Sequence, residues 1–514
     1  MPTELREIER KYDAGPGARL PDLSGLPEVA SQSEPEETIL EATCFDTDAL
    51  DLTRAGITLQ RRSGQDEGGT GWRLSLPEPH GTYTDLDLPH APEPPREFLE
   101  LLTARLRGRP ARPVARITTA RMRRTLRGRD GAALADVVFD DVTAEAFGPL
   151  ATLSRWNEVE FELADGSRAL LKALDRRLRR DGLRPSRNTS KLRTVLAGRL
   201  PEPRRQPRQV HSGPSRSAGE FVLAYLREQR DQLLADDVMV RRDQPDAVHQ
   251  MRVASRRLRS ALRSFDALVP KERRQKAAGE PPQLPAELRW LAGELGAARD
   301  EEVLTERLLH EAAATAVELV LGPVSARITG HFAPRRAAAR ERLLDALESP
   351  RYFALLDRLD ALLAQPPAGP AGRRPEKTLA PLVRRELKRA RRRMRGAAHA
   401  AAGSERDVAL HEARKAVKRA RYAVEAVTPV FGKDARRTAR ALKEIQTELG
   451  GHQDTVIARA EIRQLAVRAH ADRENAFTYG LLYQRQAEQA AALRKRARKA
   501  WRQADGKKRT AWAR

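Results

Sequence analysis

VHQMRVASRRLRSALRSF (residues 248–265) and LHEARKAVKRARYAVEAV (residues 410–427) are two copies of one helix-forming segment in the C-terminal part of the chain. The copies align without a gap, which places histidine on histidine and arginine on arginine: His249 on His411, Arg252 on Arg414, Arg259 on Arg421. A second pair of segments, residues 288–303 and 442–457, shares the pattern ELG-x-x-x-D. A helical unit that occurs twice predicts an all-α bundle with pseudo-twofold symmetry.

Each copy carries a stripe of basic side chains on one helix face, because their spacing follows the helical period. The stripes consist of His249, Arg252, Arg256, Arg259 and Arg263 in the first copy and of His411, Arg414, Lys418 and Arg421 in the second. Like charges at this spacing repel each other. A solvated helix face is the plain alternative, but the repetition favours a cationic groove that binds phosphate, which arginine contacts with two parallel hydrogen bonds. The histidines could cap, pack or donate to phosphate, and they are too few for a metal site.

The chain of 514 residues has a formal net charge of +24, and the excess lies entirely in its C-terminal part. Residues 1–200 carry 31 Lys and Arg against 32 Asp and Glu, whereas residues 201–514 carry 64 against 39. The single cysteine, Cys44, excludes intrachain disulfides and thiol-rich metal sites. No apolar leader or long apolar run is present, so we expect a soluble, cytoplasmic protein with a polyanionic partner and no membrane contact.

The first 200 residues contain short alternating stretches separated by Gly and Pro, which predicts an antiparallel sheet or barrel. Helices are expected near residues 95–107 and 168–181. A Pro- and Arg-rich stretch then predicts a linker. The predicted organisation is a first domain at 3–200, the linker at 201–217, a helical domain at 218–505 with repeats at about 218–364 and 378–505, and a basic tail at 506–514.

Acidic and basic side chains alternate along the expected strands, so that several of them share a face. The acids are Glu7, Glu9, Asp136, Asp140, Glu158, Glu160 and Glu162, and the bases are Lys11, Arg62, Arg73, Arg116, Arg121 and Lys191. Carboxylates inside a barrel are costly unless they bind cations, and Mg²⁺ or Mn²⁺ prefers such oxygens. An exposed face is the alternative for any single strand. Together, acids for a metal and bases for phosphate predict a triphosphate site.

EIERK at residues 7–11 resembles the ExExK signature of CYTH domains, the triphosphate tunnel metalloenzymes. Further segments follow the order of that family over about residues 3–200: CFDTDALDLTRAGITLQRRSG from residue 44, GWRLSLP from 71, PVARITTAR from 113, WNEVEFEL from 156 and GLRPSRNTSKL from 182. The C-terminal repeat, with its His-x-x-Arg helices and LG-x-x-x-D turns, resembles the CHAD domain over about residues 216–505. The chain is therefore similar to bacterial proteins in which CYTH precedes CHAD.

The resemblance implies an α+β multidomain protein, with an eight-stranded antiparallel β tunnel and flanking helices followed by an all-α bundle. It implies catalytic acids at Glu7, Glu9, Asp140, Glu158 and Glu160, with Mg²⁺ or Mn²⁺ held by Glu7, Glu9, Glu158 and Glu160. It implies phosphate contacts from Lys11, Arg62, Arg116 and Lys191, to which the strand pattern adds Arg121. CHAD domains bind inorganic polyphosphate along a basic groove and are associated with polyphosphate granules.

Gln60, Ser75 and Thr118 stand where the family pattern has basic residues, and we expect Arg61 and Arg73 to point to the opposite face. Each lost charged contact weakens phosphate binding by about 1.5–3 kcal/mol. The first hypothesis is therefore a polyphosphate-binding protein whose CYTH tunnel binds metal-triphosphate weakly. The alternative is an active metal-dependent triphosphatase or polyphosphatase, acting on tripolyphosphate, with the CHAD domain as substrate anchor. Nucleic acid is disfavoured as a partner, because stacking platforms and DNA-binding motifs are not evident.

Overall fold

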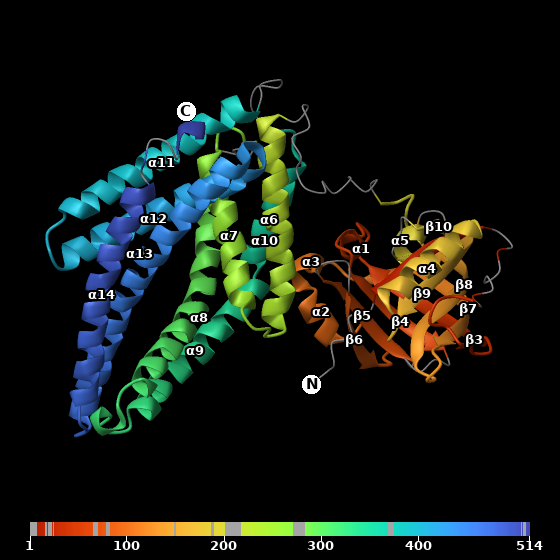
Figure 1. The fold of residues 1–514 in the computed structure, drawn as a ribbon, viewed down its shortest axis with the longest axis horizontal. Coiled ribbons are helices and arrows are strands. Elements are labelled where there is room, and N and C mark those ends of the chain that lie inside the picture. Colours follow the sequence, from red (N-terminus) through yellow and green to blue (C-terminus); the bar gives the residue numbers. More distant parts are fainter. Residues whose placement is uncertain are drawn as a thin grey trace. The chain divides into compact units, whose positions relative to one another are not determined.

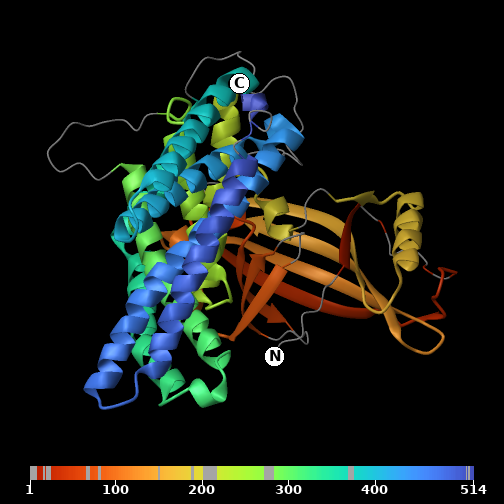
Figure 2. The same ribbon diagram turned by 60° about the vertical axis from the view of Figure 1, so that its left-hand side comes forward.

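The computed structural model describes residues 8–15, 18, 23, 25–64, 70–78, 83–148, 151–186, 190–200, 217–270, 283–367, 375–504, 506 and 510–513. The chain divides into two compact units, Met1–Gln206 and Pro207–Arg514 (Figures 1 and 2). The predicted linker lies outside the described residues, apart from its last residue, Ser217. Among the described helices, none combines the length and the apolar character that a membrane span requires.

The N-terminal unit is built on one antiparallel sheet with the strand order β10-β1-β9-β8-β7-β3-β4-β5-β6, and β2 pairs with β7. The strands are β1 (Ile8–Ala14), β2 (Ser31–Gln32), β3 (Glu36–Asp46), β4 (Thr58–Gly64), β5 (Gly71–Pro77), β6 (Tyr83–Pro89), β7 (Arg112–Arg127), β8 (Ala133–Ala146), β9 (Thr152–Leu163) and β10 (Arg184–Pro185). The flanking helices are α1 (Asp51–Arg54), α2 (Arg96–Leu101), α3 (Thr103–Leu106), α4 (Arg168–Arg180) and α5 (Lys191–Val195). The predicted antiparallel sheet with flanking helices is confirmed, and two strands of two residues each join the eight expected ones.

The two faces of the curved sheet are covered by different helices (Figure 2). Residues that lie directly opposite each other on neighbouring strands share one face of the sheet. By this rule one face carries Lys11, Arg121, Asp140, Glu158 and Glu160, and we call it the inner face. On the outer face, Phe161 belongs to a core with Leu174 of α4. At one end of the inner face, Ile117 belongs to a core with Leu192 of α5. Helix α5 therefore covers that end of the inner face, and its first residue is Lys191.

The C-terminal unit is helical throughout its described elements. The helices are α6 (Ala218–Arg241), α7 (Ala247–Ser264), α8 (Leu284–Ala313), α9 (Val324–Glu348), α10 (Pro350–Ala364), α11 (Pro375–His399), α12 (Ser404–Ala426), α13 (Thr428–Ala471) and α14 (Phe477–Ala504), with short 3₁₀ turns at Val317–Leu319 and Ala511–Ala513. Helix α7 packs against α6 and α8, α12 packs in the same way against α11 and α13, and α7 also contacts α12. The predicted all-α bundle is confirmed, and α10 is an addition to the first copy.

Local sequence explains where several of these helices begin and end. Ser217 and Glu220 form a capping box at the start of α6. Gly432, at a φ of 60°, divides α13 into two helical parts. The residues expected as a basic tail include Trp512, whose ring lies 4.7 Å from that of Phe431 and whose indole nitrogen donates to Thr438 Oγ1 at 3.0 Å. The end of the chain is thus attached to α13 by an aromatic contact.

Candidate functional site

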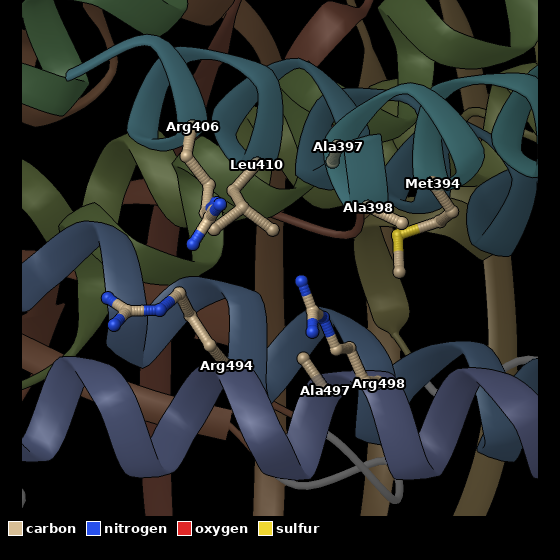
Figure 3. Close-up of a pocket in the computed structure, with 8 residues that line it drawn as sticks. All are labelled: Met394, Ala397, Ala398, Arg406, Leu410, Arg494, Ala497 and Arg498. Atoms are coloured by element: carbon tan, nitrogen blue, oxygen red, sulfur yellow. The ribbon is translucent and has the colours of Figure 1, made fainter. Parts of the chain in front are cut away.

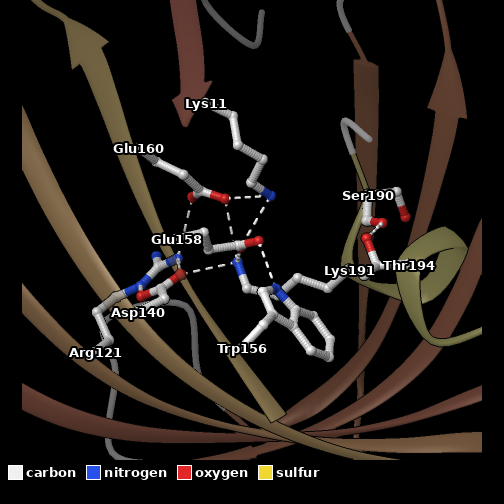
Figure 4. Close-up of polar contacts among 9 residues, drawn as sticks. All are labelled: Lys11, Arg121, Asp140, Trp156, Glu158, Glu160, Ser190, Lys191 and Thr194. Carbon is white, nitrogen blue, oxygen red and sulfur yellow. Dashed lines mark hydrogen bonds and ion pairs between the residues drawn. The ribbon is translucent and has the colours of Figure 1, made fainter. Parts of the chain in front are cut away.

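Six charged side chains meet on the inner face of the N-terminal sheet (Figure 4). They are Lys11 of β1, Arg121 of β7, Asp140 of β8, Glu158 and Glu160 of β9, and Lys191 of α5. Strand register brings them together, because Arg121 lies opposite Asp140, and Asp140 lies opposite Glu158. Lys11 lies opposite Glu160 on the other edge of β9. We call this set the tunnel cluster.

Ion pairs link all members of the tunnel cluster. Lys191 Nζ lies 2.8 Å from Asp140 Oδ2, 2.6 Å from Glu158 Oε1 and 3.1 Å from Glu160 Oε1. Lys11 Nζ lies 2.9 Å from Glu158 Oε1 and 2.5 Å from Glu160 Oε1. Arg121 donates to both oxygens of Asp140, at 2.9 and 2.8 Å. Three cations therefore neutralise three carboxylates.

Burial and charge act in opposite directions on the pKa values in the tunnel cluster. Burial favours a raised pKa for the Glu160 carboxyl, but Lys191, Lys11 and Arg121 hold that pKa well below its usual range. Burial favours a lowered pKa for the Lys191 amine, yet the three carboxylates raise that pKa above its usual value. Both groups therefore remain ionised at neutral pH. Trp156 Nε1 donates to Glu158 Oε2 at 3.0 Å and orients that carboxylate.

The carboxylates of the tunnel cluster are suited to a hard divalent cation. Asp140, Glu158 and Glu160 each offer an oxygen within 4.8 Å of the others, and such oxygens are the ligands that Mg²⁺ and Mn²⁺ prefer. The same oxygens are held by Lys11, Arg121 and Lys191, so a metal gains them only when these cations turn to another anion. The donor set therefore fits a metal that arrives together with a phosphate chain.

The remaining predicted acids at the start of β1 are only partly placed. Glu7 lies outside the described residues, and nothing is described of the Glu9 side chain. The register pairs Glu9 with Glu162, which in turn lies opposite Asp136. The backbone of Glu9 is thus placed two residues before Lys11 on β1.

The predicted phosphate ligands Arg62 and Arg116 lie on opposite faces of the sheet. Arg62 pairs with Ala42, which is on the same side of β3 as Thr38, the partner of Arg121. Arg116 pairs with Thr43 and is exposed on the outer face. Both side chains nevertheless line a polar hollow of about 400 Å³, together with Arg61 and His90. No member of the tunnel cluster lines this hollow.

The expected direction of Arg73 is wrong. Arg73 lies opposite Gln60, and Gln60 alternates onto the same side of β4 as Arg62, so Arg73 is on the inner face. Its partners there are Asp85 and Asp87 of β6, which the guanidinium contacts at 3.1 and 2.7 Å. The expectation was wrong because Arg73 and Ser75 lie two residues apart on β5, and side chains two residues apart on a strand share a face.

A second charged site lies where α7 contacts α12, and it consists of cations. We call Arg252, Arg256, Arg259, Arg414 and Lys418 the basic cluster. Burial, together with the charges of the four arginines, lowers the pKa of Lys418 to about 6. Arg252 pairs with Asp300 at 2.6 Å. Within the described residues the other four members form no ion pair, and the buried Nε atoms of Arg256 and Arg414 have no hydrogen-bond partner.

Two glycines of the repeated ELG pattern make room for two arginines of the basic cluster. A Cβ on Gly296 would lie 3.4 Å from Arg252 Nη2, and a Cβ on Gly450 would lie 3.5 Å from Arg414 Nε. The guanidinium groups therefore lie directly over the helices α8 and α13. The sequence showed that these glycines recur, but only the packing shows what they do.

The other predicted members of the basic stripes surround this cluster. Burial lowers the pKa of both His249 and His411, and the cluster arginines nearest to each act in the same direction. Arg263 is exposed near the end of α7. Arg421 differs from the rest, because it pairs with Glu425 at 3.4 Å and lies over the ring of Tyr422.

The hollow between α11, α12 and α14 is too small to be a ligand site (Figure 3). Its floor is apolar and includes Met394 and Leu410, and Arg494 and Arg498 lie at its rim. The hollow holds about 20 Å³, which is room for about one water molecule. We therefore assign it no function.

The fold and the two charged sites define a protein that joins a triphosphate-tunnel domain to a basic helical domain. Residues 5–193 match the CYTH domain, and residues 224–463 match the CHAD domain. The chain is 36% identical to Uncharacterized protein Rv2226 of Mycobacterium tuberculosis over 98% of its own length and 97% of that relative. It belongs to this family of CYTH–CHAD proteins, as the sequence motifs predicted.

Two solved structures are similar to part of the chain. PptA from Streptomyces chartreusis is 23% identical, with 55% of this chain and 99% of that chain covered and a TM-score of 0.45. The CHAD domain from the plant Ricinus communis is 28% identical, with 56% and 94% covered and a TM-score of 0.42.

Proposed function

We propose that the C-terminal unit binds inorganic polyphosphate through the basic cluster. The observation that carries the proposal is the half-buried Lys418 among four arginines, of which only Arg252 forms an ion pair in the described part of the chain. Asp454 of α13 is an acid near Arg414 that also acts on the cluster. Like charges in a low-dielectric environment repel strongly. A bound polyanion removes this repulsion, and its phosphate oxygens accept charge-assisted hydrogen bonds from the guanidinium groups.

A phosphate chain suits the basic cluster better than a nucleic acid does. Sequence-tolerant binding of single strands depends on aromatic side chains on which bases stack. Tyr422, the aromatic neighbour of the cluster, is buried, whereas the exposed aromatics among the described residues of the helical unit, Phe477 and Tyr483, belong to α14. Bases at the cluster would therefore lack a stacking partner.

Titration of the full chain with long-chain polyphosphate at several salt concentrations tests this proposal. We expect submicromolar, saturable binding. The logarithm of the association constant should fall linearly with the logarithm of the salt concentration, because binding releases counterions from the polyanion. Duplex DNA should compete weakly at physiological salt. Absent saturation, or displacement by DNA at equal concentration, would reject the proposal.

Polyphosphate binding should take up protons because of Lys418. In the free protein a pKa of about 6 leaves this amine largely neutral at pH 7, and a bound phosphate chain raises the pKa. The ligand therefore prefers the protonated form, and affinity should rise as the pH falls from about 8 to about 6. Calorimetry in buffers with different heats of ionisation measures the uptake.

The control for proton uptake is Lys418→Arg, which stays charged and does not titrate in this range. We expect this variant to lose most of the proton uptake. A His249→Gln/His411→Gln variant measures how much of the uptake comes from the two histidines. Equal uptake by Lys418→Arg and the unchanged protein would contradict the assignment to Lys418.

Hydrolysis of tripolyphosphate with a divalent metal is the second candidate function, and the tunnel cluster supports it. Its cations and carboxylates neutralise each other. The cations suit the negative oxygens of a phosphate chain, and the carboxylates suit a metal ion. Mg²⁺ or Mn²⁺, when bound, supplies charge neutralisation at the phosphate. Lys11, Arg121 and Lys191 would hold phosphate oxygens, and the freed carboxylates would hold the metal and orient water.

Phosphate release from tripolyphosphate in the presence of Mg²⁺ or Mn²⁺ tests the second function. Glu160→Gln should lower the release to background. Asp141→Asn is the matched control, because Asp141 pairs with Arg155 on the outer face of the same strands. Release that does not depend on metal, or equal rates in both variants, would reject this function.

A further inference from the structure

The charge around the basic cluster is not symmetric, although the helices that carry it repeat. Beyond the cluster, α7 continues with Arg263, and the matched position on α12 is Glu425. Arg289 at the start of α8 is matched by Lys443 on α13. The two sides of one pseudo-symmetric unit therefore offer a polyanion different paths.

The path along α7 and α8 consists of cations. Arg259 lies close to Arg289, Arg263 and Arg256, and burial followed by the charges of these three arginines lowers its pKa. Arg259, Arg263 and Arg289 form no ion pair within the residues that the structure describes. Arg259 belongs to the basic cluster, and we call the other two residues the α7 arm. Arg263 and Arg289 are exposed, so a ligand can reach both.

The matched path along α12 carries acids beside its cations. Glu425 contacts Arg421 Nε at 3.4 Å and Arg257 Nη2 at 3.8 Å. The carboxylates of Glu425 and Glu228 both act on the half-buried Tyr225, so a second acid lies near this end of α12. A phosphate chain that followed α12 would meet these acids after the basic cluster.

Basic residues of α11 lie close to the end of the α7 arm. Arg385 donates to the carbonyl oxygen of Ser264 at 3.1 Å, and Arg385, Arg389 and Arg263 all lie near Arg419. Two acids lie at this point: the buried Glu386 contacts Arg419 at 2.8 Å, and the exposed Asp266 contacts Arg385 at 3.1 Å. Four arginines against two acids leave this end of α7 with a net positive charge, in contrast to the end of α12.

We propose that polyphosphate leaves the basic cluster along the α7 arm only, and that Glu425 closes the matched path along α12. This inference rests on the proposed function, since it concerns the course of the same ligand. It makes the site directional: one end of the bound chain is fixed at the cluster, and the longer remainder lies over α7 and α8. Glu425 is then a residue that determines the course of the chain without contacting it.

Two double variants, one on each side of the repeat and each removing two cations from the full chain, test the course of the ligand. Arg263→Ala/Arg289→Ala should weaken binding of long-chain polyphosphate by about tenfold or more and should lower the slope of its salt dependence. Arg421→Ala/Lys443→Ala should change the affinity less than about threefold. Equal losses in the two variants would overturn the inference while the proposed function stands.

Glu425→Gln provides a test that misfolding cannot imitate. Removing this carboxylate leaves Arg421 and Arg257 available for phosphate, so we expect tighter binding of long chains. Unchanged or weaker binding by a folded Glu425→Gln variant would overturn the closing role of Glu425. Absent binding by the unchanged protein would instead reject the proposed function itself.

Discussion

Binding of polyphosphate is expected to disappear when Arg256 and Lys418 are both replaced by glutamate. Each contact between a cation and phosphate contributes about 1.5–3 kcal/mol, and the introduced carboxylates add repulsion at the same point. The dissociation constant should therefore rise more than about a thousandfold. The effect is concentrated at these two residues because water and salt screen partly buried charges less than they screen exposed charges.

A charge-matched control separates the basic cluster from the general charge of the protein. Arg336→Glu/Arg342→Glu makes the same change in net charge at two exposed positions of α9. We expect this control to weaken binding by about tenfold at most, because exposed charges act through solvent. Equal losses in the control and the cluster variant would show that polyphosphate binds the surface without a defined site. Thermal unfolding of both variants verifies that the fold is retained.

The fold could be predicted because its signals lie within short stretches of sequence. The alternation of WNEVEFEL predicted a strand, and the recurrence of residues 248–265 at 410–427 predicted the repeated helical unit, and both are found. The docking of Trp512 on α13 could not be predicted, because it joins Phe431 and Thr438 to a distant segment that looked like a basic tail. Periodicity describes one element at a time and does not specify its partners.

In the charged sites, too, the sequence pattern of one element does not specify its partners. Strand spacing correctly suggested that Glu158 and Glu160 share a face. The same spacing puts Arg73 on the face of Ser75, although it does not show that Asp85 and Asp87 of β6 are its partners there. Helical spacing placed Arg421 in one stripe with Lys418. It did not show that Glu425, one turn further along α12, neutralises that arginine. The two halves of the repeat look equivalent in sequence and differ in charge once acids from neighbouring positions are counted.

Replacing the buried lysine of each charged site by methionine should change stability in opposite directions. Lys191→Met leaves three carboxylates of the tunnel cluster with fewer cations, and breaking a buried ion pair in this way destabilises by about 3–5 kcal/mol. Lys418→Met removes a buried amine from among four arginines. We expect that variant to stabilise the ligand-free C-terminal unit by roughly 2 kcal/mol, while polyphosphate binding weakens. Hydrogen exchange of β9 measures the stability of the N-terminal unit, and hydrogen exchange of α12 measures that of the C-terminal unit.

The pH dependence of the Lys191→Met variant has a definite sign. In the unchanged protein the pKa of Glu160 is lowered from its usual value of 4.5, so its contribution to stability is present above that value and is lost as the pH falls below it. In the variant the carboxylates repel each other, and protonation relieves the repulsion. The destabilisation should therefore be largest near neutral pH and should shrink below about pH 5. Met at either position preserves volume, so opposite signs for the two substitutions separate charge from packing. A loss of stability in both variants would show that the arginines around Lys418 are already neutralised, and a gain in both would contradict the ion pairs of the tunnel cluster.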